Sequence, residues 1–169
     1  MADPRLKFLD LCVKDVMHKD VVTVDQYLSM SEVAEIFQQH EISGAPVVDE
    51  VGKCVGMISA ADFVRFERQA KQAEAEISHG MTFDLIEDDS PGGSHVVENP
   101  FDKVYRHMSA GVQTIDASAK LYEAARIMCL EHIHRLVVLD NTERPIGIMT
   151  ALDLVATMWN LELFAELSE

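Results

Sequence analysis

The chain has few cysteines and lacks any long apolar run. Its three cysteines, Cys12, Cys54 and Cys129, lie far apart among 169 residues. Their odd number and wide spacing exclude a disulfide framework and a spaced set of metal ligands, so we expect buried, reduced thiols. No apolar run approaches the ~20 residues that span a bilayer, and the N-terminus lacks the apolar core of a signal peptide. We therefore expect a cytoplasmic protein that does not contact membranes.

Basic residues are also scarce. Fourteen lysines and arginines stand against 29 aspartates and glutamates, which gives a formal net charge of −15. Such a polyanion is repelled by phosphate backbones and anionic lipids, and no cluster of lysine and arginine offers a local exception. Nucleic acid is therefore disfavoured as a partner. The same field opposes small anionic ligands, so a phosphate site must supply its own local positive groups.

The sequence does contain an internal repeat. A shift of 91 residues aligns residues 13–64 with residues 104–155 without a gap, and 15 of these 52 positions are identical. A register held over this length establishes a duplication. A unit of about 50 residues has only a marginal core of its own. We therefore expect the two copies to pack against each other about a pseudo-two-fold axis.

Both copies have the same expected order of elements, β-α-β-β-α, so the predicted fold class is α+β. A short strand at 21–24 or 112–115 precedes an amphipathic helix. Two β-branched runs separated by turn residues then predict a hairpin, at 45–48 and 55–58 in copy one and at 136–139 and 146–149 in copy two. A second helix closes each copy.

These elements divide the chain into five parts. An N-terminal arm or helix (1–12) precedes copy one (13–66), a connection (67–103) leads to copy two (104–157), and a helix extension (158–169) ends the chain. Residues 70–77 should extend the helix that closes copy one, and residues 84–100 have the composition of a mobile acidic loop. Glu87, Asp88, Asp89 and His95 could form a metal site there. Adjacent carboxylates in a Gly/Ser-rich stretch are usually solvated, so we expect no metal.

Each hairpin leads into the motif Gly-h-h-Ser/Thr-x-x-Asp, where h is apolar, with Ser59 and Asp62 in copy one and Thr150 and Asp153 in copy two. Two interpretations fit this spacing. In the first, the hydroxyl and the carboxylate only cap the following helix. In the second, the helix N-terminus and the hydroxyl hold a phosphate, and the carboxylate accepts from the two hydroxyls of a ribose. The spacing alone does not separate them.

Copy two also carries a His-Arg pair at the start of a predicted strand. Arg135 costs free energy in a strand unless an anion pairs with it, and a phosphate suits its guanidinium. The alternative is a surface arginine that meets one of the many carboxylates. His132 and His134 are weak candidates for metal ligands because no third ligand has a fitting spacing.

The repeat, the motif and the stretch His-Arg-Leu-Val-Val at 134–138 resemble a pair of CBS domains, also called a Bateman module. The resemblance covers the chain apart from the connection and the two tips, and it is closest to the free-standing members of the family. It implies a regulatory module, not an enzyme. The module would bind an adenosine nucleotide (AMP, ADP or ATP) as a regulatory ligand in clefts between the repeats, and it would require no cofactor.

The resemblance also assigns roles to individual residues. Asp62 and Asp153 would hold ribose hydroxyls, and Ser59 and Thr150 would contact phosphate. His134 and Arg135 would bind phosphate in the cleft of Asp62. Copy one has Ser43 and Gly44 in place of the basic pair, so we expect the cleft of Asp153 to lack a cation and the two sites to be unequal. The backbone around the leading strands and the first hairpin strands would line the adenine pocket; the residues concerned are Thr23, Val24, Ala45, Thr114, Ile115 and Leu136.

The last helix, at 152–167, predicts a partner. Its apolar residues fall into two stripes, which are Leu152, Val155, Trp159 and Leu163 on one side and Leu154, Met158, Leu161 and Phe164 on the other. A helix that is apolar on two sides should be buried on two sides. One side would face the core, and the other a second module in a homodimer or an unknown regulated protein.

The sequence alone does not exclude two other functions. The first is a ligand-independent dimerisation or adaptor protein in which both aspartates only cap helices. The second is an enzyme, which is disfavoured because no activated nucleophile, metal set or catalytic phosphate loop is visible.

Overall fold

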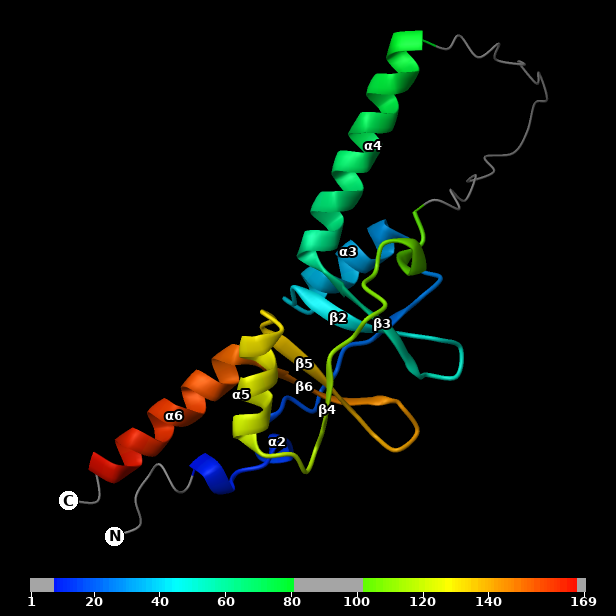
Figure 1. The fold of residues 1–169 in the computed structure, drawn as a ribbon. Coiled ribbons are helices and arrows are strands. Elements are labelled where there is room, and N and C mark those ends of the chain that lie inside the picture. The colour runs from blue at the N-terminus through cyan, green and yellow to red at the C-terminus, as the bar shows by residue number, and fades with distance from the viewer. Residues whose placement is uncertain (1–7, 81–101, 167–169) are drawn as a thin grey trace.

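The computed structural model describes residues 8–80 and 102–166, with the side chains of the two long helices described as far as residues 72 and 160. The first half contains α2 (Val13–Val16), β1 (Val24–Asp25), α3 (Met30–Gln39), β2 (Gly44–Val48), β3 (Cys54–Ser59) and α4 (Ala60–Gly80). The second half contains a 3-10 helix, η1 (Val104–Arg106), then β4 (Thr114–Asp116), α5 (Leu121–Leu130), β5 (Arg135–Leu139), β6 (Pro145–Thr150) and α6 (Ala151–Glu166). The expected β-α-β-β-α order is confirmed in both halves (Figure 1). The predicted acidic loop and its metal candidates, Glu87, Asp88, Asp89 and His95, lie outside the described residues.

Each half forms its own three-stranded mixed sheet. In the first half β1 is parallel to β2, and β2 is antiparallel to β3; β4, β5 and β6 repeat this arrangement. Both hairpins have a register shift at the same place, between Val47 and Val48 and between Val138 and Leu139. The hairpins match the prediction closely. The leading strands, β1 and β4, are shorter and begin later than predicted, and before them His18 and Ser109 form backbone bridges to the other half.

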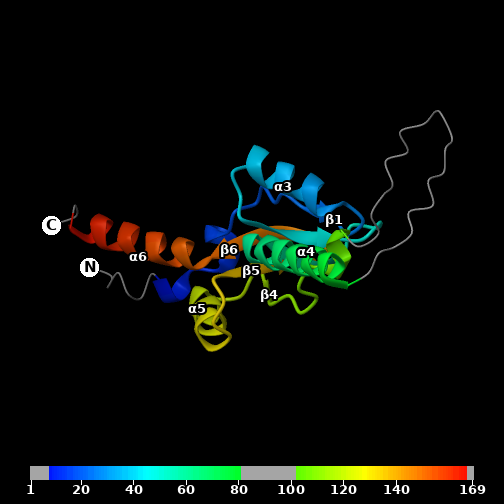
Figure 2. The same ribbon diagram turned by 90° about the horizontal axis from the view of Figure 1, so that it is seen from above.

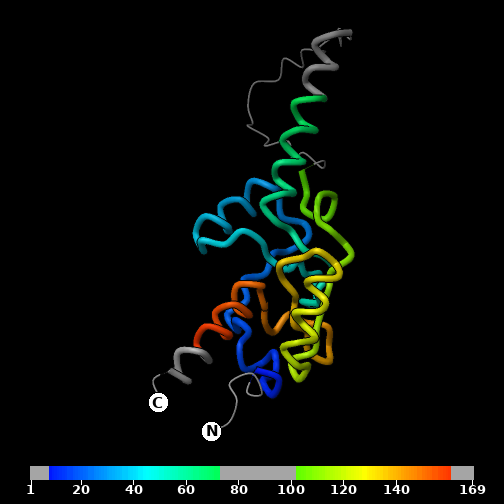
Figure 3. Tube along the Cα trace, turned by 60° about the vertical axis from the view of Figure 1, so that its left-hand side comes forward, coloured from blue at the N-terminus to red at the C-terminus, as the bar shows by residue number. Residues whose placement is uncertain are grey.

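The leading segment of each half packs into the core of the other half. Val13 is fully buried in a cluster with Leu121 and Met149 of the second half, while Val104 is fully buried in a cluster with Val33 of the first half. Figure 3 shows the blue leading segment beside the yellow and red helices of the second half. The two halves are therefore joined by an exchange of segments and not only by contact between their faces.

Backbone bridges between the halves follow the internal symmetry. The bridge between residues 18 and 148 has its counterpart between residues 109 and 57, and the bridge between residues 12 and 120 has its counterpart between residues 103 and 29. Each pair is related by the same shift of 91 residues that relates the two copies. This is the pseudo-two-fold arrangement that the duplication predicted.

The glycine of each motif is explained by this exchange. A Cβ added to Gly147 would lie 3.0 Å from Cγ of Met17 and closer still to its sulfur, and a Cβ on Gly56 would meet Met108 in the same way. Ordinary contact begins at 3.4 Å. Each thioether therefore packs directly on the bare backbone of the opposite half, and any larger residue at the glycine would displace it.

The two amphipathic helices cover opposite sides of the molecule, with the strands between them (Figure 2). Met30, Val33 and Phe37 are the buried residues of α3, so the predicted amphipathic helix buries one side. Ser29 and Glu32 form a capping box at its start, so their bonds satisfy two of the backbone N–H groups there. Helix α4 continues to residue 80, which confirms the predicted extension.

Two expectations about burial are only partly met. The three thiols are free, but Cys129 is exposed on α5 and Cys12 and Cys54 are only partly buried, so the prediction of buried cysteines is wrong for Cys129. In α6, Leu154 is buried whereas Leu152 and Trp159 are 73% and 65% exposed. Over residues 151–160, where the side chains of α6 are described, this chain therefore covers the helix on one side only. No helix in the described part of the chain is long and apolar enough to cross a membrane.

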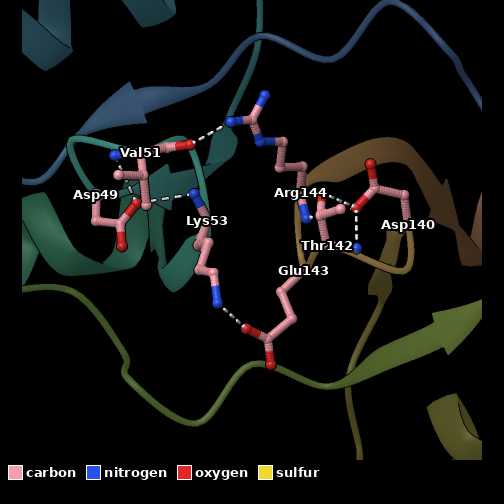
Figure 4. A network of polar contacts seen from close by, with 7 residues as sticks. All are labelled: Asp49, Val51, Lys53, Asp140, Thr142, Glu143 and Arg144. Carbon is pink, nitrogen blue, oxygen red and sulfur yellow. Dashed lines mark hydrogen bonds and ion pairs between the residues drawn. The ribbon is translucent and has the colours of Figure 1, made fainter.

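The tips of the two hairpins also contact each other (Figure 4). Lys53 Nζ lies 2.8 Å from Glu143 Oε2, and Arg144 Nη2 donates to the carbonyl oxygen of Val51 at 2.7 Å. Both ion-pair side chains are exposed, so the pair contributes little to stability. The backbone bond from Cys54 N to Glu143 O, at 2.9 Å, fixes the approach of the two tips more firmly.

Candidate ligand site between the repeats

A cavity of about 400 Å³ lies where the leading segment of the first half meets the second half. Residues 18–22 and 41–44 line it from the first half, and Arg135, Ile148 and Thr150 line it from the second. Pockets for small organic ligands commonly measure 300–1,000 Å³ and lie between domains or repeats. The cavity therefore has the size and the position of a small-molecule site.

Arg135 carries the charge of this cavity. It is the first residue of β5 and pairs with Thr150 at the end of β6, so the hairpin register sets the two side by side. Its Nη2 donates to Ser43 Oγ at 3.0 Å, and within the described residues the guanidinium forms no ion pair with a carboxylate. The guanidinium also lies against Gly44, where an added Cβ would be 3.2 Å from Cζ. An arginine in this setting has N–H groups left to bind an anion.

The structure therefore brings Arg135 together with Thr150, not with Asp62 as the resemblance implied. Lys19 and Arg135 line the same cavity as Thr150, the capping partner of Asp153, whereas the resemblance implied a cleft of Asp153 without a cation. The physical reason is the side-chain direction: Arg135 reaches across to the start of β2, where Ser43 and Gly44 leave room for it. The small residues that replace the His-Arg pair in copy one are what admits the arginine of copy two.

Thr150 and Asp153 form the cap of α6. Asp153 Oδ2 accepts from the backbone N of Thr150 at 2.7 Å and from its hydroxyl at 2.8 Å, and the Asp153 N–H donates back to that hydroxyl at 3.3 Å. The capping interpretation is therefore realised here. The other oxygen, Oδ1, accepts from His18 Nε2 at 2.9 Å. The carboxylate therefore forms hydrogen bonds both at the start of its own helix and to a side chain of the opposite half.

Ser59 and Asp62 repeat the cap at the start of α4. Asp62 Oδ2 accepts from the Ser59 backbone N and hydroxyl, both at 2.7 Å. Its Oδ1 forms an ion pair with Arg65, one turn along the same helix, and Asp62 is only 2% exposed. A ligand reaches this carboxylate only if Arg65 moves aside, and the exposed arginine side chain is free to do so.

The other predicted site residues lie beside these caps or beneath them. The side chains of Val24, Ala45 and Leu136 are fully buried and Ile115 is nearly so, which leaves only their backbone to a ligand. Thr23, Thr114 and His134 are exposed. The carbonyl oxygen of His134 accepts from Ala151 N at 2.9 Å and so helps to fix the start of α6.

Sequence reasoning missed His18, Lys19, Asp20 and Glu41, which all line the cavity. Residues 18–20 directly precede the predicted leading strand at 21–24. The repeat alignment did contain a signal, because the first three have Ser109, Ala110 and Gly111 as counterparts in copy two. This stretch carries charge in copy one and none in copy two, so the two copies differ chemically at this place.

In the described part of the chain, no group of three or more histidine, cysteine, aspartate or glutamate side chains could hold a metal ion. The polar side chains that line the cavity are the cations Arg135 and Lys19, the imidazole of His18, the acids Asp20 and Glu41 and the hydroxyls of Ser43 and Thr150. This mixed set suits a ligand with both an anionic group and neutral hydroxyl or amine donors.

The family model of the CBS domain matches twice, at residues 13–68 and 103–160. The chain is a pair of CBS domains. Both matches include the leading segment, the hairpin and the motif helix of one copy, so the cavity lies between two CBS domains. The protein MJ1426 of Methanocaldococcus jannaschii, which is uncharacterized, is 29% identical over 166 residues, covering 88% of this chain and 91% of that protein. A second uncharacterized protein of that organism, MJ1232, is 30% identical over 143 residues, but this chain spans only 38% of its length.

Solved CBS-domain structures share the fold. The CBS domain pair of protein MJ0100, in complex with 5′-methylthioadenosine and S-adenosyl-L-methionine, has a TM-score of 0.67 and 24% identity, and the match covers 89% of this chain and 97% of that one. CBSX2 in complex with AMP has a TM-score of 0.66 and 20% identity, over 89% of this chain and 98% of that one. These likenesses establish the tandem CBS architecture of this chain.

Proposed function

We propose that this chain is a regulatory module that binds an adenosine nucleotide between its two CBS domains and acts through a partner protein. The observation that carries the proposal is the guanidinium of Arg135, which faces a cavity of about 400 Å³ without forming an ion pair to any carboxylate of the described residues. In a chain of net charge −15, an arginine without a carboxylate partner among the described residues can pair with an anion that enters the cavity.

The ligand chemistry of the relatives supports an adenosine group. The two solved relatives hold different ligands, and adenine joined to ribose is the part that 5′-methylthioadenosine, S-adenosyl-L-methionine and AMP share. A 5′-phosphate is what Arg135 and Lys19 would add to that recognition. We therefore favour AMP, ADP or ATP over an uncharged nucleoside at this cavity.

The remaining site residues have proposed roles that follow the internal symmetry. Thr150 and Asp153 would meet the phosphate and the ribose of the ligand in the cavity. Ser59 and Asp62 would do the same in the second cleft, beside His134. The backbone of the leading strands would bind adenine, at Thr23, Val24, Ala45, Thr114, Ile115 and Leu136.

Thermal unfolding against a panel of adenosine, AMP, ADP and ATP tests the proposal. A ligand at about 100 times its dissociation constant adds about 2.7 kcal/mol to the free energy of unfolding. For a chain of this size that raises the midpoint by roughly 5–11 °C, at ~2–4 °C per kcal/mol. We expect a phosphorylated member of the panel to produce this shift. A midpoint that no compound moves would contradict nucleotide binding.

The partner is proposed to dock on α6. Leu152, Val155, Met158 and Trp159 are all more than half exposed on this helix, although they are apolar. A face of this kind favours a protein partner, and a second copy of the module in a homodimer is our preferred occupant. Trp159 is the single tryptophan of the chain, so its fluorescence reports on this face. We expect an emission maximum at shorter wavelength on dimerisation, and a dimer by light scattering that Trp159→Glu dissociates.

The same exposed face favours a second candidate function, which is a ligand-independent adaptor. In that case the capping bonds of Asp62 and Asp153 would be their whole role. The two functions differ in one measurable respect. An adaptor would dimerise through α6 and show no shift with any adenosine compound, whereas the regulatory module would show both.

A further inference from the structure

His18 holds the one oxygen of Asp153 that the helix cap leaves available. Its backbone is fixed by two bonds to Ile148, with N···O distances of 2.9 and 3.0 Å, so the residue stays at the edge of β6. Its Nε2 then reaches Asp153 Oδ1 at 2.9 Å, while Oδ2 is occupied by Thr150. Oδ2 already accepts two bonds from Thr150, and the imidazole that contacts Oδ1 lines the cavity whereas Asp153 does not, so a ribose in the cavity meets the ring before it can reach Oδ1.

The contact to His18 is the one that can open. The imidazole side chain is 70% exposed, whereas the Asp153 side chain is 14% exposed. Of the described residues, His18 and Thr150 line the cavity while Asp153 lies behind them and borders a second hollow next to α2. A ligand that enters the cavity therefore meets the histidine first. Rotation of its ring costs one exposed hydrogen bond, but opening the Thr150 contact would cost the cap of α6.

We propose that His18 is a latch on Asp153 that makes this cavity prefer a nucleotide over a nucleoside, an inference that rests on the proposed function. A ribose that enters from the cavity must move the imidazole aside in order to reach Oδ1. A ligand with a 5′-phosphate offers the displaced ring a new anionic partner, next to Arg135 and Lys19. An uncharged nucleoside offers none, so the loss of the His18 bond weakens its binding without compensation.

The latch belongs to one of the two clefts. The counterpart of His18 in the second copy is Ser109, which has the same backbone bridge, to Met57. A serine is too short to reach the aspartate as an imidazole does, and Asp62 is instead held by Arg65 of its own helix. The two clefts therefore differ in which element must move before the carboxylate can bind a sugar.

Calorimetric titration of adenosine and of AMP into four proteins tests the latch. These are the wild type, His18→Ala, His18→Gln and the control His40→Ala, which removes an exposed histidine that does not line the cavity. In His18→Ala we expect adenosine to bind about two- to tenfold more tightly, the worth of one ordinary hydrogen bond, and AMP to gain nothing. His18→Gln keeps an N–H that can bond Asp153, so adenosine should bind it as weakly as the wild type. His40→Ala should match the wild type for both ligands.

The outcomes separate the latch from the function on which it rests. If both ligands bind the wild type but adenosine binds His18→Ala no more tightly, the latch is refuted and the proposed function stands. If neither ligand binds any of the four proteins, both fail. A measurement on the wild type covers the case in which a variant is unstable: in NMR titration with AMP, the ring resonances of His18 should shift along the calorimetric binding curve while those of His40 remain. His18 signals that do not respond at saturating AMP would also refute the latch.

Discussion

Replacing Gly44 by alanine should weaken nucleotide binding by displacing the Arg135 guanidinium. Gly44 is the first residue of β2 and is buried. A Cβ there would lie 3.2 Å from Cζ of Arg135 and closer still to Nη1, inside the 3.4 Å at which ordinary contact begins. The guanidinium is the flexible end of a long side chain, so it would move away from the added methyl group. This movement would shift it from its present position in the cavity.

The size of the effect follows from the bond that is disturbed. A hydrogen bond to a charged group contributes about 1.5–3 kcal/mol, and we expect Gly44→Ala to lose about half of it. That corresponds to a fall of roughly fivefold in AMP affinity, with adenosine nearly unchanged. The added Cβ also comes within 3.1 Å of the carbonyl oxygen of Ile58, which is backbone and cannot retreat so easily. We therefore expect a further loss of about 1 kcal/mol in the free energy of unfolding, or roughly 2–4 °C in the midpoint.

The assay is a mutant cycle read by calorimetry. Gly44→Ala is compared with wild type, and the same change is then made in an Arg135→Ala background. If Gly44→Ala acts by displacing the Arg135 guanidinium, it should not lower the affinity for AMP any further in the Arg135→Ala background. Equal losses of AMP affinity in the two backgrounds, or an equal loss for adenosine, would refute this reasoning.

Four further predictions concern the site and the hairpin turns. Arg135→Ala should lower the binding free energy of AMP by about 1.5–3 kcal/mol, which is a tenfold or greater loss of affinity, and should change the affinity for adenosine little; Arg126→Ala on α5 is the control. Equal losses of affinity for both ligands would exclude a phosphate contact. 2′-Deoxy-AMP should bind more weakly than AMP, and Asp153→Asn should reduce that difference; indifference to the hydroxyl would exclude a ribose contact. Gly52 has φ of 83°, so Gly52→Ala should cost about 1–2 kcal/mol and lower the midpoint by roughly 2–8 °C, whereas an unchanged midpoint would show that the turn relaxes. Hydrogen bonds from the Arg144 backbone and the Thr142 side chain hold the pKa of Asp140 below its ordinary 3.8, so the stability that its carboxylate contributes is present above about pH 4 and is lost as the pH falls further. In urea titrations Asp140→Asn should therefore be less stable than the wild type at pH 7 and approach the wild type at pH 3. A difference in stability that stays constant with pH would contradict the lowered pKa.

Much of the fold could be predicted from the sequence because it is set by local pattern. The two hairpins, the amphipathic stripe of α3 and the capping residues of the motif all depend on neighbours within a few positions. The exchange of leading segments could not be predicted in this way. Val13 and Val104 occupy equivalent places in the repeat, and the sequence around each does not indicate whether it packs in the core of its own half or of the other half.

The site was partly predictable for the same reason. Thr150 and Asp153 were recognised from their spacing, but the bond from His18 to Asp153 joins residues 135 positions apart and leaves no local trace. The place of Arg135 could have been found. Extending the predicted hairpin by one residue pairs Arg135 with Thr150, and the choice of Asp62 came from the family resemblance instead of from this register.

A crystal structure of the chain grown with AMP would test nucleotide binding most directly. We predict density for the nucleotide in the cavity of about 400 Å³, with its phosphate within hydrogen-bond distance of the Arg135 guanidinium. Saturating AMP that leaves the cavity empty, with Arg135 still bonded only to Ser43, would contradict the proposed function.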